Sequence, residues 1–172
     1  MKPALVGIRA VRFKSRLTRG DLMLRRYSLK DVGSLHRLFA HYNDSTVQFR
    51  GPRFFFWIWL HRTFQWIYTI RLPTGRATRI IGFIGLYGME STRRVNLSIA
   101  LFDPGDRAHG YGRRALELLL DDFKNRSIAM EVRVEVTADN AASLAFFEKL
   151  GFERIHDGPR GHVLRLAPNQ KG

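Results

Sequence analysis

The stretch from Arg94 to Arg126 decides the fold, and it reads RVNLSIALFDPGDRAHGYGRRALELLLDDFKNR. Its beginning, Arg94–Leu101, alternates polar or small residues with Val, Leu and Ile, and this period of two predicts a strand. Its end carries apolar side chains at the spacing of one helical face: Leu116, Leu119, Leu120 and Phe123. We therefore expect a strand, a loop rich in proline and glycine, and an amphipathic helix to about Asn125.

The same patterns continue toward the C-terminus. Glu131–Val136 alternates again and predicts a strand. Ala141–Leu150 predicts a helix that ends at Gly151, because glycine is favoured just after a helical C-terminus. Phe152–Ile155 and Val163–Leu166 indicate a closing pair of strands around a glycine-containing turn.

The first part of the chain predicts strands and helices in alternation. Residues 1–19 indicate a tail or a loose edge strand, and Asp21–Arg26 predicts a first strand. Ser28 followed three residues later by Asp31 is typical of a helix start, and the helical spacing continues to about Tyr42.

A proline-initiated, aromatic segment follows. Pro52–Phe64 predicts a second helix, since proline favours the first helical turn. Trp66–Leu72 and Arg79–Gly88 then predict the two strands of a hairpin around the turn Pro73–Ala77. The whole order of elements indicates a mixed α/β fold.

Length and composition indicate one folded domain. The chain has 172 residues, 45% of them apolar, and we assign residues 21–168 to the domain and residues 1–20 to a basic tail or edge segment. The absence of cysteine excludes a disulfide framework and a Cys-ligated zinc site.

No apolar run approaches the ~18 residues of a membrane span, and the basic N-terminus lacks the apolar segment of a secretory signal. We expect a soluble, cytoplasmic protein.

The positive charge is concentrated in one part of the chain. The formal net charge is +14, and residues 1–100 carry all of it, with 18 Lys or Arg against four acids, whereas the rest carries 11 of each. A basic surface attracts anionic partners such as RNA or an acidic protein. A proteome-wide bias or a solvated tail would give the same composition, so both interpretations stay open.

The segment Arg107-Ala108-His109-Gly110-Tyr111-Gly112 carries the strongest chemical signal. Its two glycines permit positive φ and a close approach of the backbone to a ligand. Successive backbone N–H groups can converge on an anion there, and the helix that begins at this point adds its own unpaired N–H groups. Arg107, Arg113 and Arg114 add positive charge. The segment fits a pyrophosphate cradle, although a plain strand-to-helix turn would also use glycine.

Two motifs in order resemble the GNAT acetyltransferase superfamily. Arg107-x-x-Gly110-x-Gly112 matches its R/Q-x-x-G-x-G/A signature. The segment Asn140–Phe152, NAASLAFFEKLGF, resembles its N-x-x-S-x-x-F/L-Y-E-K-x-G-F block. The resemblance extends from about Leu22 to Leu166. It implies a mixed, mostly antiparallel central sheet flanked by helices, with splayed central strands.

The resemblance also implies roles for individual residues, with acetyl-CoA as the cosubstrate. The loop from Arg107 to Arg113 would hold the pyrophosphate of coenzyme A. Backbone groups near Ile99 and Leu101 would hold its pantetheine arm and polarise the thioester carbonyl. Asn140 would hydrogen-bond the cofactor, and it is also a favoured helix cap. The cofactor-binding set is thus Ile99, Leu101, Arg107, Ala108, His109, Gly110, Tyr111, Gly112, Arg113, Asn140 and Phe147.

Acid and base groups are harder to assign. Many relatives have tyrosine at the position of Phe147, and that tyrosine is proposed to protonate the leaving thiolate. Because a thiol has a pKa of roughly 8.5, the thiolate can leave without such an acid. Glu90, at the end of the hairpin, is the candidate general base, or else a surface turn residue. His109 is interpreted as a spacer.

No metal is expected, because His36, His41 and His61 show no metal-ligand spacing with a carboxylate. The aromatic stretch Phe54–Tyr68 falls where the early helices of the family shape the acceptor pocket, so the resemblance implies a pocket for an apolar or flat acceptor or for a long acyl chain. Ordinary core with a contact between the subunits of a homodimer is the alternative.

The leading hypothesis is an N-acetyltransferase that transfers acetyl from acetyl-CoA to a primary amine, either a small molecule or a protein N-terminus. A second hypothesis is an acyltransferase that docks RNA or the ribosome through its basic first half. A third is an acyl-CoA-binding protein without catalysis.

Overall fold

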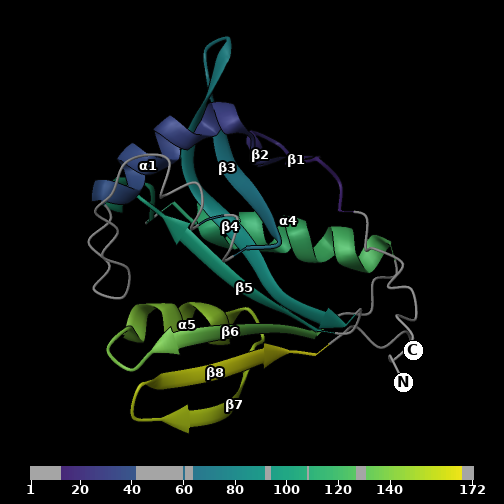
Figure 1. Cartoon of the computed structure of the whole chain (residues 1–172), viewed down its shortest axis with the longest axis vertical. Coiled ribbons are helices and arrows are strands. Elements are labelled where there is room, and N and C mark those ends of the chain that lie inside the picture. The colour runs from purple at the N-terminus through teal and green to yellow at the C-terminus, as the bar shows by residue number, and fades with distance from the viewer. Residues whose placement is uncertain are drawn as a thin grey trace, which may run out of the picture.

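An open sheet organises the chain, with strands in the order β1-β2-β3-β4-β5-β6-β8-β7 (Figure 1). The computed structural model describes residues 13–41, 60, 64–91, 94–107, 109–126 and 131–167, without the side chains of residues 39–41 and 89–91. The strands are β1 Arg16–Arg19, β2 Leu22–Arg26, β3 Trp66–Thr74, β4 Ala77–Ser91, β5 Arg94–Leu101, β6 Glu131–Thr137, β7 Glu153–Gly158 and β8 Gly161–Leu166.

The described helices are short apart from α4. They are the 3-10 turn η1 Leu29–Asp31, α1 Val32–His41, α3 Pro104–Arg107, α4 Tyr111–Asn125 and α5 Ala141–Lys149. Among the described residues, no helix combines the length and the apolar character needed to cross a lipid bilayer. The predicted second helix, Pro52–Phe64, lies outside the described residues except for Leu60 and Phe64.

The predicted strands and helices around the glycine loop are confirmed. β5 has the bounds that its alternation predicts, and α4 ends at Asn125. The start signal of Ser28 and Asp31 is a capping box, in which the Asp31 side chain accepts a bond from the Ser28 N–H at 3.0 Å. β1 falls within the basic N-terminal segment, where it is an edge strand paired with β2.

One short helix, α3, interrupts the loop after β5 and was not predicted. Pro104 occupies its first position, where the missing N–H costs nothing. The Asp103 side chain accepts a hydrogen bond from the Gly105 N–H at 2.8 Å. A single turn built by such local bonds has no periodic apolar pattern, so periodicity could not reveal it.

The sheet is antiparallel except at its centre, and this exception creates the splay. β5 and β6 are parallel and pair only at Arg94 with Glu131, Val95 with Val132, and Asn96 with Arg133. β5 then continues to Leu101 and β6 to Thr137 without further pairing between them. The two strands diverge toward these ends in Figure 1. The expected splayed, mostly antiparallel sheet is therefore confirmed.

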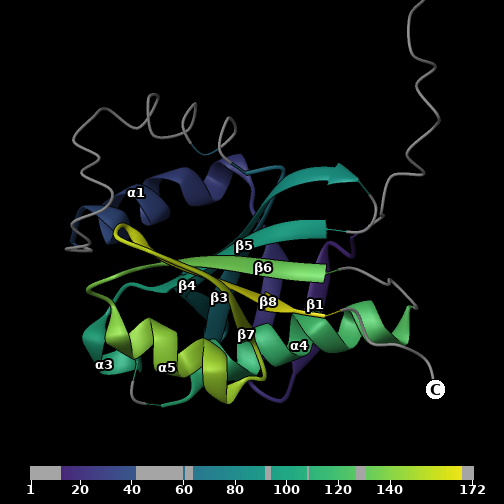
Figure 2. The same ribbon diagram turned by 90° about the horizontal axis from the view of Figure 1, so that it is seen from below.

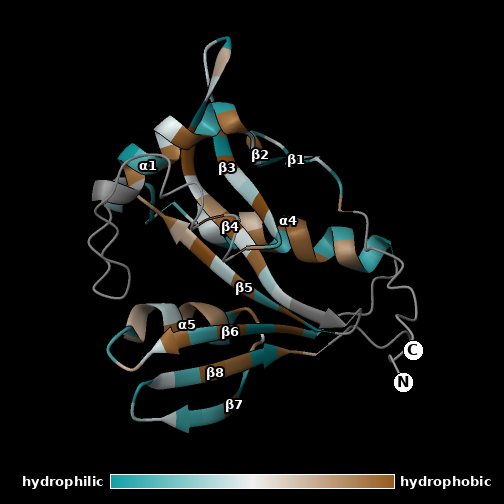
Figure 3. Ribbon diagram, in the orientation of Figure 1, coloured by the Kyte–Doolittle hydropathy of each residue, from teal (hydrophilic) through white to brown (hydrophobic). Residues whose placement is uncertain are grey.

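Helices cover the two faces of the sheet differently. Figure 2 shows α1 on one side and α4 with α5 on the other. The larger core cluster joins the buried face of α4 to alternate residues of the central strands, such as Val95 and Val134. The smaller cluster packs Leu35 of α1 against Ile67 and Phe83. The central strands alternate in hydropathy accordingly, whereas the edge strand β7 is largely hydrophilic (Figure 3).

Part of the basic N-terminal segment is fastened to α4. Lys14 forms an ion pair with the buried carboxylate of Asp122 at 3.0 Å, and Arg19 pairs with Asp121. The Phe13 ring packs against Phe123, with the two centroids 5.7 Å apart. Some of the positive charge of this segment is therefore neutralised within the fold.

A buried ionic cluster fastens the start of the α1 region to β3. Asp31 is only 5% exposed and receives a hydrogen bond from Arg71 at 2.6 Å, while Arg25 approaches the same oxygen at 3.0 Å. Arg71 also donates to the hydroxyls of Thr69 and Thr78, at 2.9 and 3.2 Å. Burial alone would raise the pKa of Asp31, but the hydrogen bonds and charges of Arg71 and Arg25 hold it below its usual value.

Candidate functional site

The N-terminus of α4 has the local backbone geometry that the predicted anion site requires. Gly110, the N-cap residue, has φ +72°, a left-handed backbone conformation that residues other than glycine rarely adopt. It accepts the first hydrogen bond of the helix from the Arg114 N–H at 3.0 Å, so the N–H groups of the three residues between them precede the regular helical bonds. A Cβ atom at Gly110 would meet nothing within 4 Å, so the loop surface is open.

The same helix start lies beside the diverging end of β5. A Cβ atom at the buried Gly112 would lie 3.7 Å from Leu101 and 3.8 Å from the ring of Phe146. Gly112 thus joins α4 to the end of β5 and to α5. The first N–H groups of α4 therefore lie next to the end of β5, where the gap from β6 opens.

The side chains of the glycine loop are largely engaged with the protein. Arg107 donates from Nε to the Leu101 carbonyl at 3.1 Å. Arg113 pairs with Glu117 at 2.7 Å, and Arg114 pairs with Asp21. Glu117 and Asp21 therefore offset the charges of Arg113 and Arg114, whereas Arg107 donates to a neutral carbonyl, which does not offset its charge beside the loop. Ala108 lies outside the described residues.

His109 has a structural role that its interpretation as a spacer did not include. Its ring stacks on Tyr111, with centroids 5.7 Å apart and planes 18° apart. The guanidinium of Arg114 also lies over the Tyr111 ring, with its central carbon 5.7 Å from the ring centroid. At the start of α4, His109 is exposed and Tyr111 and Arg114 are half-buried.

Ile99 and Leu101 lie where the gap opens. Both are only partly buried, although they share a face with the fully buried Val95 and Leu97. Because β6 has moved away at this level, no described strand covers the backbone of β5 on that side. These residues are placed as a pantetheine-binding edge would require, and that role remains a prediction.

Asn140 and Phe147 both have structural partners on α5. Asn140 is the N-cap, and its side-chain oxygen accepts a bond from the Ser143 N–H at 3.0 Å. Phe147 is buried in the larger core cluster, edge-on to Phe146 at 5.0 Å and to Phe152 at 5.2 Å. Their contacts with a cofactor remain predictions, and Phe146 is the side chain that reaches the glycine loop.

A carboxylate that sequence reasoning missed lies on the α1 side of the gap. Glu135 is exposed and alternates with the buried Val134 and Val136, so it faces away from α4. It follows Arg133, the last residue of β6 that pairs with β5.

Tyr87 of β4 is close enough to Glu135 for the charge of this carboxylate to act on its hydroxyl. Burial, and then the charge of Glu135, raise the pKa of Tyr87. Tyr87 pairs with Asn96 in the sheet and packs against the α1-side core cluster. The exposed position of Glu135 was visible in the alternation of the strand, but the point at which β6 leaves β5 was not.

Glu90 has a different placement. It lies in the irregular register between Tyr87 and Ser91, and Ser91 pairs with Arg94 at the closed end of the β5–β6 pair. The Glu90 side chain is outside the described part, so its role as a base stays a prediction. No group of three His, Cys, Asp or Glu able to hold a metal occurs among the described residues.

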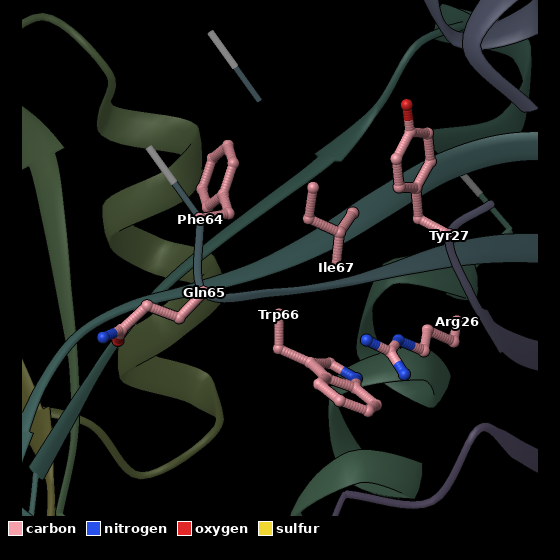
Figure 4. Close-up of a pocket in the computed structure, with 6 residues that line it drawn as sticks. All are labelled: Arg26, Tyr27, Phe64, Gln65, Trp66 and Ile67. Carbon is pink, nitrogen blue, oxygen red and sulfur yellow. The ribbon is translucent and has the colours of Figure 1, made fainter. Parts of the chain in front are cut away.

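A hollow of about 100 Å³ lies at the start of β3. It is lined by Arg26, Tyr27, Phe64, Gln65, Trp66 and Ile67 (Figure 4). Phe64 links the hollow to the gap, because its ring packs edge-on to Tyr87 with centroids 5.8 Å apart. Gly85 is required here, since a Cβ atom would lie 2.3 Å from the Phe64 ring. Burial raises the pKa of Tyr27 to about 12, with a further contribution from Asp31.

Comparisons with known proteins agree with this geometry. Residues 21–153 match the model of the acetyltransferase (GNAT) domain. The [ribosomal protein bS18]-alanine N-acetyltransferase of Escherichia coli is 44% identical over 50 residues, 29% of this chain and 33% of that protein. The N-alpha-acetyltransferase RimI of Mycobacterium tuberculosis is 30% identical over 90 residues, 51% and 53% of the two chains. Matches to the curated relatives span 23% to 53% of the relatives' own length.

Solved structures share the fold. An acetyltransferase (GNAT family) from Bacillus anthracis superposes with a TM-score of 0.70 at 14% identity, covering 88% of this chain and 98% of the other. At this identity the similarity shows the fold alone. The family model, in contrast, matches residues 21–153, which include both the glycine loop and the segment Asn140–Phe152. The chain therefore belongs to the GNAT acetyltransferase family, whose members use acetyl-CoA as cosubstrate.

Proposed function

We propose that this protein is an N-acetyltransferase that acetylates a primary amine by direct attack within a ternary complex. The observation that carries the proposal is the position of the α4 N-terminus, with its N-cap glycine open to solvent, beside the diverging end of β5. Acetyl-CoA supplies an activated thioester, and transfer forms a C–N bond and breaks the C–S bond, releasing coenzyme A as a thiolate.

The residues on the α4 side would hold the coenzyme. The N–H groups of Tyr111, Gly112 and Arg113 fit a pyrophosphate, because unpaired N–H groups at a helix start favour anions. Backbone groups of β5 near Ile99 and Leu101 would align the pantetheine arm and polarise the thioester carbonyl. Holding both reactants in one gap supplies much of the rate enhancement through orientation.

The residues on the α1 side would handle the acceptor. An ammonium group must lose a proton before its nitrogen can attack, so a carboxylate near the gap is useful. Glu135 fits this role better than Glu90, since it lies where the strands separate. No general acid is assigned, because Phe147 has no proton to give.

A polypeptide N-terminus is favoured as the acceptor over a polyamine. The chain has a net charge of +14, which repels a polycation. Acids near Glu135 on the same face are paired: Glu131 with Arg133 at 2.5 Å, and Glu153 with Arg165 at 3.7 Å. The acetylation of a ribosomal-protein alanine by the Escherichia coli relative supports the same choice. Thiol release with a panel of peptides, small amines and spermidine tests it.

Gly110→Asp is expected to weaken coenzyme A binding at least tenfold, about 1.4 kcal/mol. The substitution places a side chain and a negative charge in the anion cradle, and it strains a backbone with positive φ. Isothermal titration calorimetry measures the dissociation constant. Gly75→Asp is the matched control, because Gly75 also has positive φ (+59°) and open space but lies in the β3–β4 turn. Equal affinity of the folded Gly110 variant and the wild type would remove the cradle assignment.

Phe147→Tyr is expected to leave the rate unchanged or to raise it modestly. Tyrosine is frequent at this position in relatives, and a phenol there could protonate the leaving thiolate. Phe147 is buried between Phe146 and Phe152, so the hydroxyl must find room at its edge. The measurement is thiol release at saturating substrates. Complete loss of activity in a folded variant would mean that the apolar ring itself is needed beside the thioester.

A further inference from the structure

A buried carboxylate stands directly before the anion cradle. Asp106 lies in α3, four positions ahead of Gly110, and is 8% exposed. Both of its oxygens accept hydrogen bonds from Arg79 of β4, at 2.8 and 2.9 Å. The Arg79 side chain itself is half exposed. Such a two-bond pair fixes geometry as well as charge.

This pair belongs to a set of bonds that fasten residues 102–107 to the sheet. The Phe102 N–H donates to the Ile81 carbonyl of β4 at 3.1 Å, and Arg107 donates to the Leu101 carbonyl of β5. Arg79, the third residue of β4, connects this strand to α3 through its side chain. The course of the chain into the glycine loop therefore depends on this contact.

The pair also sets the local charge. Without Arg79, the carboxylate of Asp106 would remain nearly buried and uncompensated, close to the position proposed for a pyrophosphate. An unpaired buried charge destabilises its surroundings, and a like charge near a bound anion weakens binding. The hydrogen bonds that Arg79 donates to Asp106 raise the pKa of Arg79, which therefore stays charged over any working pH.

We propose that Arg79 is a positioning residue for coenzyme A: it holds Asp106 so that α3 presents the glycine loop, and it neutralises the carboxylate beside the phosphate site. The inference rests on the proposed function, because it requires that the loop binds the coenzyme. It adds to that function a residue of the hairpin that neither motif contains and that need not touch the cofactor.

Calorimetry with coenzyme A as the probe tests the proposal in four variants. Arg79→Ala is expected to weaken binding at least tenfold, whereas Arg79→Lys, which keeps the charge without the two-bond geometry, should lose less. The double variant Arg79→Ala with Asp106→Asn removes both charges and should regain part of the lost affinity. Arg154→Ala is the control, because it removes an arginine of β7 from an exposed pair with Glu148 of α5 that includes no residue of the glycine loop, and it should bind like the wild type.

Further readouts separate this role from a general loss of structure. The KM for the amine should stay within about twofold in Arg79→Ala while the affinity for coenzyme A falls, and thermal unfolding should show a folded protein. If Arg79→Ala does not fold, the test is made with the other two variants: Arg79→Lys and the double variant should both bind coenzyme A more weakly than the wild type. Wild-type affinity in Arg79→Ala, or no recovery in the double variant, overturns the inference. Failure of the wild type to bind coenzyme A would instead overturn the proposed function.

Discussion

Replacement of Glu135 by Gln is expected to lower kcat for acetyl transfer about a hundredfold or more at pH 7, without weakening coenzyme A binding. General-base catalysis by a positioned side chain contributes on the order of 10²–10⁴ in rate. Glutamine keeps the size of the side chain and removes its ability to take a proton. Glu135 is exposed on β6, so the folded state should tolerate the change.

The pH dependence of the rate distinguishes a base from a binding residue. A peptide α-amine has a pKa of about 8 and becomes neutral by itself in more alkaline solution. The defect of Glu135→Gln should therefore shrink as the pH rises from about 6.5 to 9. A residue that only binds the ammonium would instead raise KM, with kcat little changed.

Two comparison variants make this result specific. Glu153→Gln changes a carboxylate on the same side of the sheet that is paired with Arg165 on the outer strands, and it should keep wild-type kcat. Glu90→Gln tests the alternative base. A large loss of kcat in Glu90→Gln together with wild-type activity in Glu135→Gln would reverse the assignment made from the gap geometry.

Local patterns predicted most elements of this fold because each is amphipathic by itself. The alternation of β5 and the apolar face of α4 need no partner to be recognised, and Ser28 with Asp31 marks a helix start by local hydrogen bonding. The splay has no such signature. β6 remains a regular strand to Thr137, and nothing in its own residues says that pairing with β5 ends at Arg133. That expectation came from resemblance to a family.

Site residues could be predicted where a local pattern marks them, but not where their role depends on a neighbouring strand. Gly110 and Gly112 could be identified from the sequence, because they lie between a predicted strand and a predicted helix and match the spacing of a family signature. Glu135 could not be distinguished from an ordinary surface residue of a strand without knowing its neighbour across the gap.

The net charge of a segment, read from the sequence, does not show how much of that charge is neutralised in the folded protein. Residues 1–100 carry +14, but partners more than 90 positions away neutralise part of it, as in the pairs Lys14–Asp122 and Arg19–Asp121. Binding of an anionic partner such as RNA therefore remains a hypothesis. A variant that neutralises the basic residues before Gly20 would break these ion pairs of the fold as well as weaken any binding of RNA.

Asp31→Asn is expected to lower the free energy of unfolding by about 3–5 kcal/mol, the cost of breaking a buried pair and leaving its partner uncompensated. Arg71 would keep its charge in a site that is 5% exposed, and its partners there would all be uncharged: the hydroxyls of Thr69 and Thr78 and the amide oxygen introduced at position 31. Arg71→Met should cost less, because Arg25 and the Ser28 N–H still stabilise the Asp31 carboxylate. Arg25→Met, which removes the more exposed cation, should cost about 1 kcal/mol or less.

Acid titration checks the origin of this stability. Because the folded state lowers the pKa of Asp31, the carboxylate stabilises the protein above the ordinary aspartate pKa of about 3.9, and this contribution is lost as the pH falls through the lowered value. The difference in unfolding free energy between wild type and Asp31→Asn should therefore be constant from about pH 7 to 5 and shrink in stronger acid. Urea unfolding at several pH values measures it. A difference that does not change with pH would assign the loss to packing or to the capping box, since neither requires an ionised carboxylate on Asp31.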